Sequence, residues 1–278
     1  MSHLANIGEH EFGLFQRFIY EAAGISLSSA KKALVCGRLA RRVQHCNLAG
    51  YGAYFRLLAS GEAPAEVQIA VDLLTTNETY FFREPKHFDW LRRFAATRRE
   101  PAQPFRVWSA ASSTGEEAYS IAMVLADCLG GAAWQVTGSD ISARVLERAR
   151  IGHYSMRRAS RVPKEYLKRF CLRGVDEHEG TLLIDRQLRQ RVQFCQVNLN
   201  DSLPPLGSFD VIFLRNVMIY FNDETKRRVV ERLVALLKAD GWLLVGHSES
   251  LHGINETMEQ VAPAIYRRRG GHHPARVP

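Results

Sequence analysis

Polar residues that could hold a ligand follow four predicted strands of this sequence. A small-residue loop, 109–117, follows a strand at 105–110, and Asp140 follows one at 135–139. Asn198 follows a strand at 192–196, and the pair Arg215 and Asn216 follows one at 209–214. One polar residue after a strand is ordinary. Four in succession predict a ligand site, because the carboxyl ends of parallel strands meet at one edge of a sheet.

The stretch 106–120 is expected to form a strand, a turn and the start of a helix. Its turn contains a single glycine, Gly115, so the G-x-G-x-x-G pattern of dinucleotide sites is missing. Glu116 and Glu117 open the helix, where a bound phosphate would need positive charge. The loop therefore suits a nucleoside-like ligand with amino and hydroxyl groups. Taken alone, it could also be an ordinary corner between strand and helix.

Asp140 has the position of a ribose-binding acid. It stands about 20 residues beyond the first turn, at the end of the second strand, where a carboxylate can accept both ribose hydroxyls. The spacing does not separate adenosine in a dinucleotide from adenosine in another cofactor. The missing phosphate loop favours the other cofactor.

An alternation of strands and helices from Phe105 onward predicts a doubly wound, mostly parallel sheet, which makes this an α/β protein. Apolar residues recur at helical spacing before that point, so residues 1–97 are expected to form a helical domain. The two prolines of 98–104 predict a linker, and 105–278 form the second domain. A small β-subdomain is expected to be inserted at about 171–191.

One predicted helix near the amino end carries a basic stripe. Lys31, Arg38, Arg42 and His45 fall within about 60° of one another on a helical wheel, with Arg41 beside them. The opposite side is apolar, with Ala33, Cys36, Ala40 and Val43. Two interpretations stay open. The stripe is either a solvated helix face or a surface that docks an acidic helix.

Composition limits the remaining classes. The 278 residues carry a net charge of +8, which permits an acidic partner, and their five cysteines form no C-x-x-C pair. A metal site is therefore not expected, and a reducing cytoplasm is. No apolar run reaches the ~18 residues of a membrane span, and the first residues do not resemble a secretory signal. Membrane insertion is not expected.

Four stretches together resemble the chemotaxis receptor methyltransferases, the CheR family. They are Thr76–Arg83 (TNETYFFR), Trp108–Ser120 (WSAASSTGEEAYS), Arg215–Phe221 (RNVMIYF) and Gly246–Ser250 (GHSES). The resemblance implies an all-helical amino domain and a Rossmann-like domain that binds S-adenosylmethionine and carries an inserted β-subdomain. It also implies methylation of glutamate side chains on the cytoplasmic coiled coil of chemoreceptors.

The same resemblance assigns roles residue by residue. Asn77, Thr79 and Arg83 border the methionine and sulfonium end of the cofactor, and Tyr220 lies close to the methyl group. One of the two acids Glu116 and Glu117 points inward, and Glu117 is chosen here; it and Asp140 hold the amino group or the ribose. Asn198 and Leu199 lie on the adenine side, and Arg215 and Asn216 form the floor. Arg83 and Tyr220 are the predicted catalytic residues. The chain departs from many relatives in lacking a glycine–cysteine pair before Ser113 and in having Ala118 where proline is common.

The sequence thus predicts a monomeric protein-glutamate O-methyltransferase whose partner is the helical bundle of a chemoreceptor. Lys31, Arg38, Arg41 and Arg42 are the predicted partner-binding residues. An RNA methyltransferase is the alternative enzyme, which the positive charge permits, although no RNA-binding module is evident. A signalling scaffold that binds cofactor without activity is the third hypothesis. Whether the insertion binds a receptor tail is left open.

Overall fold

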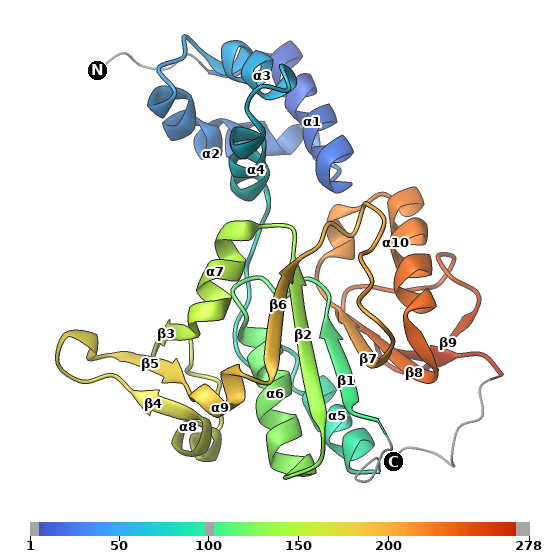
Figure 1. The fold of residues 1–278 in the computed structure, drawn as a ribbon. Helices are drawn as coiled ribbons and strands as arrows, with labels where there is room; N and C mark the ends of the chain where they lie inside the picture. The colour runs from blue at the N-terminus through green and yellow to red at the C-terminus, as the bar shows by residue number, and fades with distance from the viewer. Residues whose placement is uncertain (1–5, 98–102, 271–278) are drawn as a thin grey trace.

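The structure is a computed structural model that describes residues 6–97 and 103–270. Its amino-terminal part is helical, as the sequence predicts (Figure 1). Gly24 ends the first helix with a positive φ of 71°, a conformation that favours glycine. The four helices are α1 (Glu9–Ala23), α2 (Lys32–His45), α3 (Tyr51–Ala59) and α4 (Pro64–Leu74).

These helices close around one apolar core. Phe15, Ile19, Leu39 and Tyr54 are fully buried there, and burying each such side chain contributes roughly 1.5–3 kcal/mol. The buried face of α2 consists of Val35, Leu39 and Val43, so of the apolar residues that the helical wheel selected only Val43 is buried. Within the described residues, no helix is both long and apolar enough to cross a membrane.

The second part is built on a seven-stranded sheet with the order β6-β2-β1-β7-β8-β10-β9. The first five strands in this order run parallel, and β10 pairs antiparallel with both β8 and β9. The chain winds outward from β1 in one direction and from β7 in the other, so the order reverses between these two strands. Ligands of such sheets bind at this reversal. The strands are β1 (Phe105–Ser109), β2 (Trp134–Asp140), β6 (Val192–Gln196), β7 (Phe209–Leu214), β8 (Leu237–Val245), β9 (Met258–Ala262) and β10 (Ile265–Arg268).

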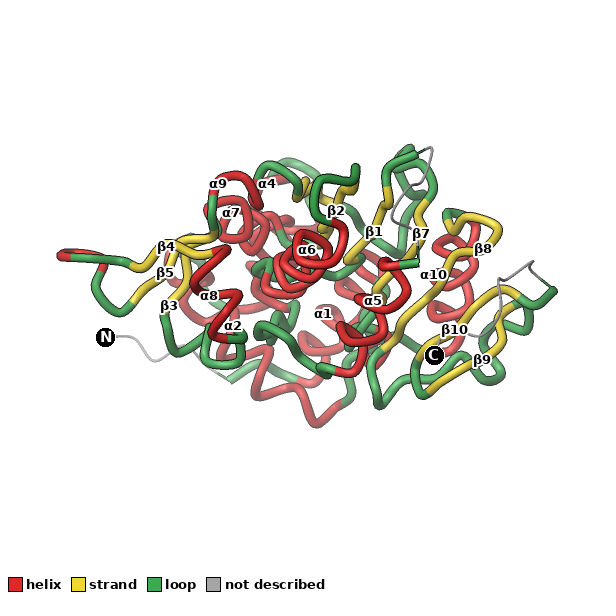
Figure 2. The backbone as a smooth tube through the Cα atoms, turned by 90° about the horizontal axis from the view of Figure 1, so that it is seen from below, coloured by secondary structure: helices red, strands yellow, loops and turns green. Residues whose placement is uncertain are grey.

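Helices cover both faces of the sheet, as Figure 2 shows. Successive side chains of a strand point to opposite faces. Val107 packs with α5 (Lys86–Ala96) and α6 (Glu116–Leu129), whereas Trp108 packs with α10 (Asp223–Ala235) on the other side. The predicted doubly wound, mostly parallel sheet is confirmed. The hairpin partner β9 was not predicted.

The insertion forms a separate three-stranded antiparallel sheet with the order β3-β5-β4. It projects from the side of the main sheet in Figure 1. The sequence predicts the hairpin of β4 and β5 but not β3. Of the predicted linker, residues 98–102 lie outside the described residues, and the domain boundaries stay predictions. Helix α7 (Ala143–Ile151) packs on the main sheet and leads into the insertion, which contains β3 (His153–Ser155), α8 (Lys164–Phe170), β4 (Cys171–Arg173) and β5 (Thr181–Ile184); α9 (Arg186–Arg189) leads back to β6.

Candidate active site

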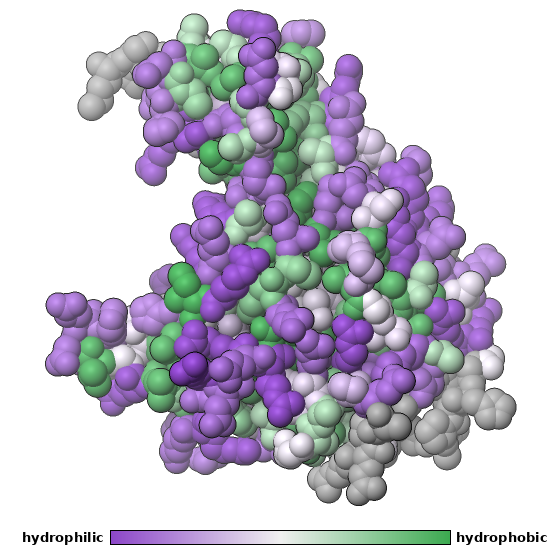
Figure 3. All heavy atoms as spheres, viewed as in Figure 1, coloured by the Kyte–Doolittle hydropathy of each residue, from purple (hydrophilic) through white to green (hydrophobic). Residues whose placement is uncertain are grey.

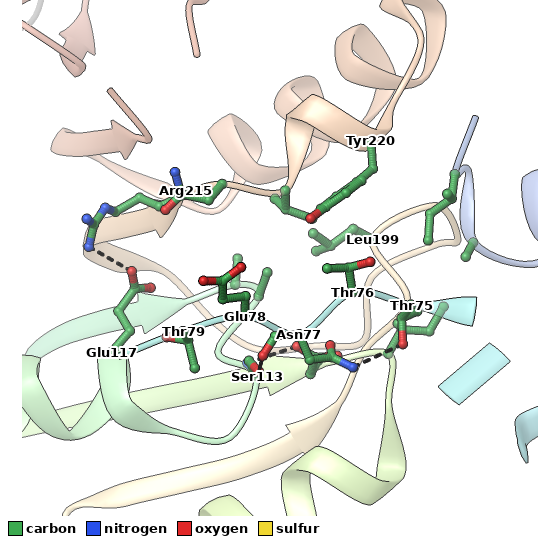
Figure 4. Close-up of a pocket in the computed structure, with 18 of the residues that line it drawn as sticks. Thr75, Thr76, Asn77, Glu78, Thr79, Ser113, Glu117, Leu199, Arg215 and Tyr220 are labelled. Carbon is green, nitrogen blue, oxygen red and sulfur yellow. Dashed lines mark hydrogen bonds and ion pairs between the residues drawn. The ribbon is translucent and has the colours of Figure 1, made fainter. Parts of the chain in front are cut away.

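A pocket opens at the reversal between β1 and β7. Segments far apart in the sequence line it: the end of α1, the loop after α4, and the loops that follow β1, β2, β6 and β7. Figure 4 shows their side chains converging on one space. The structure brings together all ten residues that the sequence selected for it: Asn77, Thr79, Arg83, Glu117, Asp140, Asn198, Leu199, Arg215, Asn216 and Tyr220.

Asp140 is fixed at the end of β2 by two backbone amides. Its Oδ2 accepts a hydrogen bond from Ser113 N at 2.9 Å, and its Oδ1 accepts one from Ser142 N at 3.0 Å. Burial nevertheless raises the pKa of Asp140 to about 6, because removal from water disfavours the charged form. The carboxylate is thus oriented before any ligand arrives.

Arg215 lies between two carboxylates at the floor of the pocket. Its guanidinium donates to Glu117 Oε2 at 2.8 Å and to Glu84 Oε2 at 2.9 Å. It also donates to the backbone carbonyl of Arg83. Burial raises the pKa of Glu117 although Arg215 opposes the shift. For Glu84 burial acts in the same upward direction, but Arg215 and further hydrogen bonds outweigh it and lower the pKa.

The two acids at the start of α6 point in different directions. Glu117 lines the pocket and accepts from Ser109 Oγ at 2.7 Å. Glu116 is fully buried away from it, 2.8 Å from the Arg158 guanidinium and 2.6 Å from Thr114 Oγ1. Of the two acids, only Glu117 is available to a ligand in the pocket.

The segment after α4 forms the opposite wall. Ser113 Oγ donates to Asn77 O at 2.9 Å, and Asn77 Nδ2 donates to Thr75 Oγ1 at 3.2 Å (Figure 4). Ser113 takes a φ of 48°, which turns the loop after β1 toward this wall. Arg83 is partly exposed and its guanidinium donates to Glu78 O at 3.2 Å.

The end of the helical domain closes the pocket near the predicted adenine side. Ala23 and Ile25 line it, which the sequence did not indicate. Ser26 N donates to Tyr220 O at 2.8 Å. The amide of Asn198 donates to Ala22 O at 2.7 Å, so this side chain holds α1, while the neighbouring Leu199 supplies an apolar surface. These are contacts between domains, and no local pattern reveals them.

Glu249 is a second support that sequence reasoning missed. It is 9% exposed and accepts from the backbone amides of Asn216 (2.7 Å), Gly246 (2.7 Å) and Ile219 (3.2 Å). A Cβ on Gly246 would lie 2.4 Å from Asn216 Nδ2, which explains the glycine. The resemblance in the stretch Gly246–Ser250 points to this region without assigning a role to Glu249.

The basic stripe of α2 separates into two kinds of residue. Arg38 donates to Leu74 O at 2.9 Å and to Thr75 O at 3.0 Å, and Arg42 pairs with Glu66. Lys31, Arg41 and His45 are exposed. Arg38 and Arg42 are therefore bound to groups within the helical domain, whereas the three exposed residues remain accessible to a partner. Figure 3 shows that the surface is hollowed between the helical domain and the inserted sheet. Docking of a receptor by this helix stays a prediction.

Comparison with known proteins identifies the family. The model described as "CheR methyltransferase, all-alpha domain" matches residues 10–75, and "CheR methyltransferase, SAM binding domain" matches residues 77–266. The chain belongs to the CheR methyltransferase family. It is 40% identical over 271 residues to a chemotaxis protein methyltransferase of Escherichia coli, covering 96% of this chain and 93% of the relative. The Salmonella typhimurium relative is 41% identical (96% and 92%), and chemotaxis protein methyltransferase 2 of Pseudomonas aeruginosa is 40% identical (92% and 92%).

S-adenosylmethionine is the cofactor of this CheR-family domain. The donor set agrees with a cationic nucleoside, because the pocket combines the carboxylates of Glu117 and Asp140 with apolar Ile141 and Leu199. A triphosphate would instead lie against the acidic side chains at the start of α6, where it needs hydrogen-bond donors or positive charge. The chemistry of the pocket and the family therefore agree. The predicted S-adenosylmethionine-dependent methylation in chemotaxis is confirmed, and the glutamate substrate stays a prediction.

Proposed function

We propose that the protein transfers the methyl group of S-adenosylmethionine to glutamate side chains on the cytoplasmic helical bundle of a chemoreceptor. One observation carries the proposal. Arg83 and Tyr220 line the same pocket as Asp140 and Glu117. The pocket thus pairs acids that suit a cationic nucleoside with a guanidinium that suits an incoming carboxylate.

The reaction requires no general base from the protein. A glutamate carboxylate has a reference pKa of about 4.3 and is ionised at neutral pH. The carboxylate oxygen forms a bond to the methyl carbon, the carbon–sulfur bond breaks, and its electron pair stays on sulfur. S-adenosylmethionine supplies the electrophilic methyl. The task of the chain is to hold oxygen, carbon and sulfur in line.

Each pocket residue has one task in this proposal. Arg83 steers the substrate carboxylate and Tyr220 positions the methyl group, while Asn77 and Thr79 border the methionine end. Asp140 accepts the ribose hydroxyls and Glu117 the amino group. Leu199 packs on the adenine side, with Asn198 holding the wall behind it. Arg215 and Asn216 form the floor.

The receptor would approach across the hollow beside α2. Arg41 on α2 and Lys31, in the short turn just before it, are exposed cations, and they complement an acidic bundle. Such charges act mainly on the rate of encounter and the choice of partner. We further propose that the protein works as a monomer in the cytoplasm.

Labelled S-adenosylmethionine tests the reaction. The protein is incubated with receptor cytoplasmic fragments or with total RNA, and the label that is transferred to each is measured. The labelled products are then treated with mild base. We expect label on receptor fragments that base releases as methanol, as glutamate methyl esters require. Label on RNA would favour the alternative enzyme, and cofactor binding without transfer would favour the scaffold.

Arg83→Ala separates substrate steering from cofactor binding. Because a misplaced substrate can cost about a hundredfold in rate, we expect turnover to fall by about that factor. The affinity for S-adenosylhomocysteine, measured by calorimetry, should stay within a few-fold of the parent protein. Loss of cofactor binding instead would make Arg83 a cofactor residue and contradict the proposed division of roles.

A further inference from the structure

Three potential metal ligands converge beside the floor of the pocket. Glu84 Oε2 lies 3.6 Å from His87 Nδ1 and 3.8 Å from His247 Nε2. One ligand atom from each residue lies within 4.8 Å of the others. Two ligands bonded to one Zn²⁺ at about 2.0–2.1 Å in tetrahedral geometry lie roughly 3.3–3.5 Å apart. The two separations from Glu84 Oε2 are a few tenths of an ångström wider, whereas the two histidine nitrogens are placed only within 4.8 Å of each other, so the exposed His247 ring would have to move to complete the site.

The imidazole of His87 is almost completely buried, which is unusual for a polar side chain. It is 1% exposed, and neither ring nitrogen makes a hydrogen bond of normal geometry among the described residues, although the backbone of Pro263 lies near enough to favour the protonated ring. A buried polar group without a partner costs free energy. Burial, followed by the Arg215 cation, lowers the pKa of His87 to about 3. The imidazole is therefore neutral at physiological pH, and a neutral imidazole can bind a metal ion.

We propose that Glu84, His87 and His247 form a binding site for one divalent transition-metal ion of the Zn²⁺ class. Two imidazoles and one carboxylate are a recurrent zinc ligand set, and imidazole also suits other late first-row ions. Carboxylate oxygens without imidazole would favour Mg²⁺ or Ca²⁺. The mixed donors here favour a transition metal.

The second shell supports this assignment. Asn216 Nδ2 donates to Glu84 Oε1 at 3.2 Å, and the backbone amide of His247 donates to the same carboxylate at 3.3 Å. Hydrogen bonds of this kind orient a ligating carboxylate. Arg215 adds positive charge 2.9 Å from Glu84 Oε2, but it also pairs with Glu117. Arg215 divides its charge between these two carboxylates, so it only partly neutralises Glu84.

An ion can reach the site from outside the cofactor pocket. The side chain of His247 is 45% exposed. His247 and His87 line a second groove together with Trp90, Pro263 and others. The bound ion would join the loop 246–250 to the segment that begins at Arg83. It would thereby fix Glu84, the partner of Arg215, without entering the methyl-transfer site.

Metal binding by the full-length protein tests the proposal without any measurement of methyl transfer. After treatment with a chelator, the protein is titrated with Zn²⁺ by calorimetry and with Co²⁺ by absorption spectroscopy. We expect one saturable equivalent of Zn²⁺. The Co²⁺ complex should show ligand-field bands in the visible region and no thiolate charge-transfer band in the near ultraviolet. A strong thiolate band would assign binding to cysteines and overturn the site.

Variants locate the ion. His247→Ala removes a half-exposed ligand, so folding should survive, and the affinity for Zn²⁺ should fall at least tenfold. His252→Ala, which alters an exposed histidine close by, and the double variant His272→Ala with His273→Ala should bind as the parent does. The proposal is wrong if His247→Ala binds Zn²⁺ unchanged, if a control variant loses the ion, or if the parent binds none. In those cases His87 and His247 only pack edge to face, with their rings 5.0 Å apart. Each of these outcomes leaves the methyl-transfer assay free to succeed or fail.

Discussion

The pocket and the basic stripe of α2 are both groups of polar residues that the sequence selected. In the structure the residues of the pocket converge on one space, whereas those of the stripe point to different surroundings. Residues from six segments meet in the pocket. Along α2 and the short turn before it, neighbouring basic residues separate: Arg38 and Arg42 turn to partners inside the protein, whereas Lys31 and Arg41 face solvent. The order of parallel strands predicts that residues at their carboxyl ends meet at one edge of the sheet. A helical wheel predicts only the angle at which a side chain leaves the helix axis, not what that side chain contacts.

The largest expected effect is on stability. Arg42→Ala removes the partner of Glu66, a carboxylate 8% exposed whose pKa the Arg42 hydrogen bonds lower. Breaking a buried pair leaves an uncompensated charge. Tyr54 still donates to Glu66 at 2.6 Å, so we expect a loss of about 3 kcal/mol in the free energy of unfolding. Chemical denaturation measures it, and exposed Arg41→Ala should cost less than about 0.5 kcal/mol. Equal stability of the two variants would mean that Arg42 is merely a surface cation.

The second prediction concerns cofactor affinity. Hydrogen bonds to a charged acceptor contribute roughly 1.5–3 kcal/mol, so Asp140→Ala should weaken S-adenosylhomocysteine binding about 10- to 100-fold. Isothermal calorimetry measures the dissociation constant. Glu177→Ala, which removes an exposed carboxylate of the insertion, is the control and should bind normally. An unchanged constant in folded Asp140→Ala would remove Asp140 from the site.

The third prediction is a pH dependence of the same affinity. Because burial raises the pKa of Asp140 to about 6, the carboxylate is mostly ionised at pH 7 and mostly protonated at pH 5. The ionised form is the better acceptor for ribose hydroxyls, so affinity should be highest above pH 6. It should fall by up to about tenfold between pH 7 and pH 5. Asp140→Asn cannot titrate and should lose this dependence; a variant as sensitive to pH as the parent would assign the titration elsewhere.

The smallest expected effect is on receptor docking. Reversing Lys31 and Arg41 to glutamate places like charge against an acidic bundle, and we expect a rise of a few-fold in the Michaelis constant for receptor fragments. The effect should shrink in high salt, because the Debye length is ~8 Å at physiological ionic strength. Affinity for S-adenosylmethionine should stay the same. With glutamine in place of both residues, the Michaelis constant should lie between that of the parent and that of the glutamate double variant. No change at low salt would mean that these cations only keep the helix face wet.

The same contrast explains what could be predicted from the sequence. Strands such as β1 and β7 are buried apolar runs followed by polar residues, so their sites could be located. The strand β3 has only three residues, and β9 lacks a buried apolar run. Glu84 follows no strand, and Glu249 lies four residues beyond the end of β8. Their roles depend on backbone amides and a guanidinium brought from elsewhere. The use of Asn198 to hold α1 depends on a contact between domains.

A crystal structure with S-adenosylhomocysteine bound would show directly how the pocket holds the cofactor. We expect the ribose hydroxyls on the Asp140 carboxylate, the adenine beside Leu199, and the sulfur facing the space between Arg83 and Tyr220. A sulfur directed away from these two residues, or a ribose held without Asp140, would contradict the proposed binding mode.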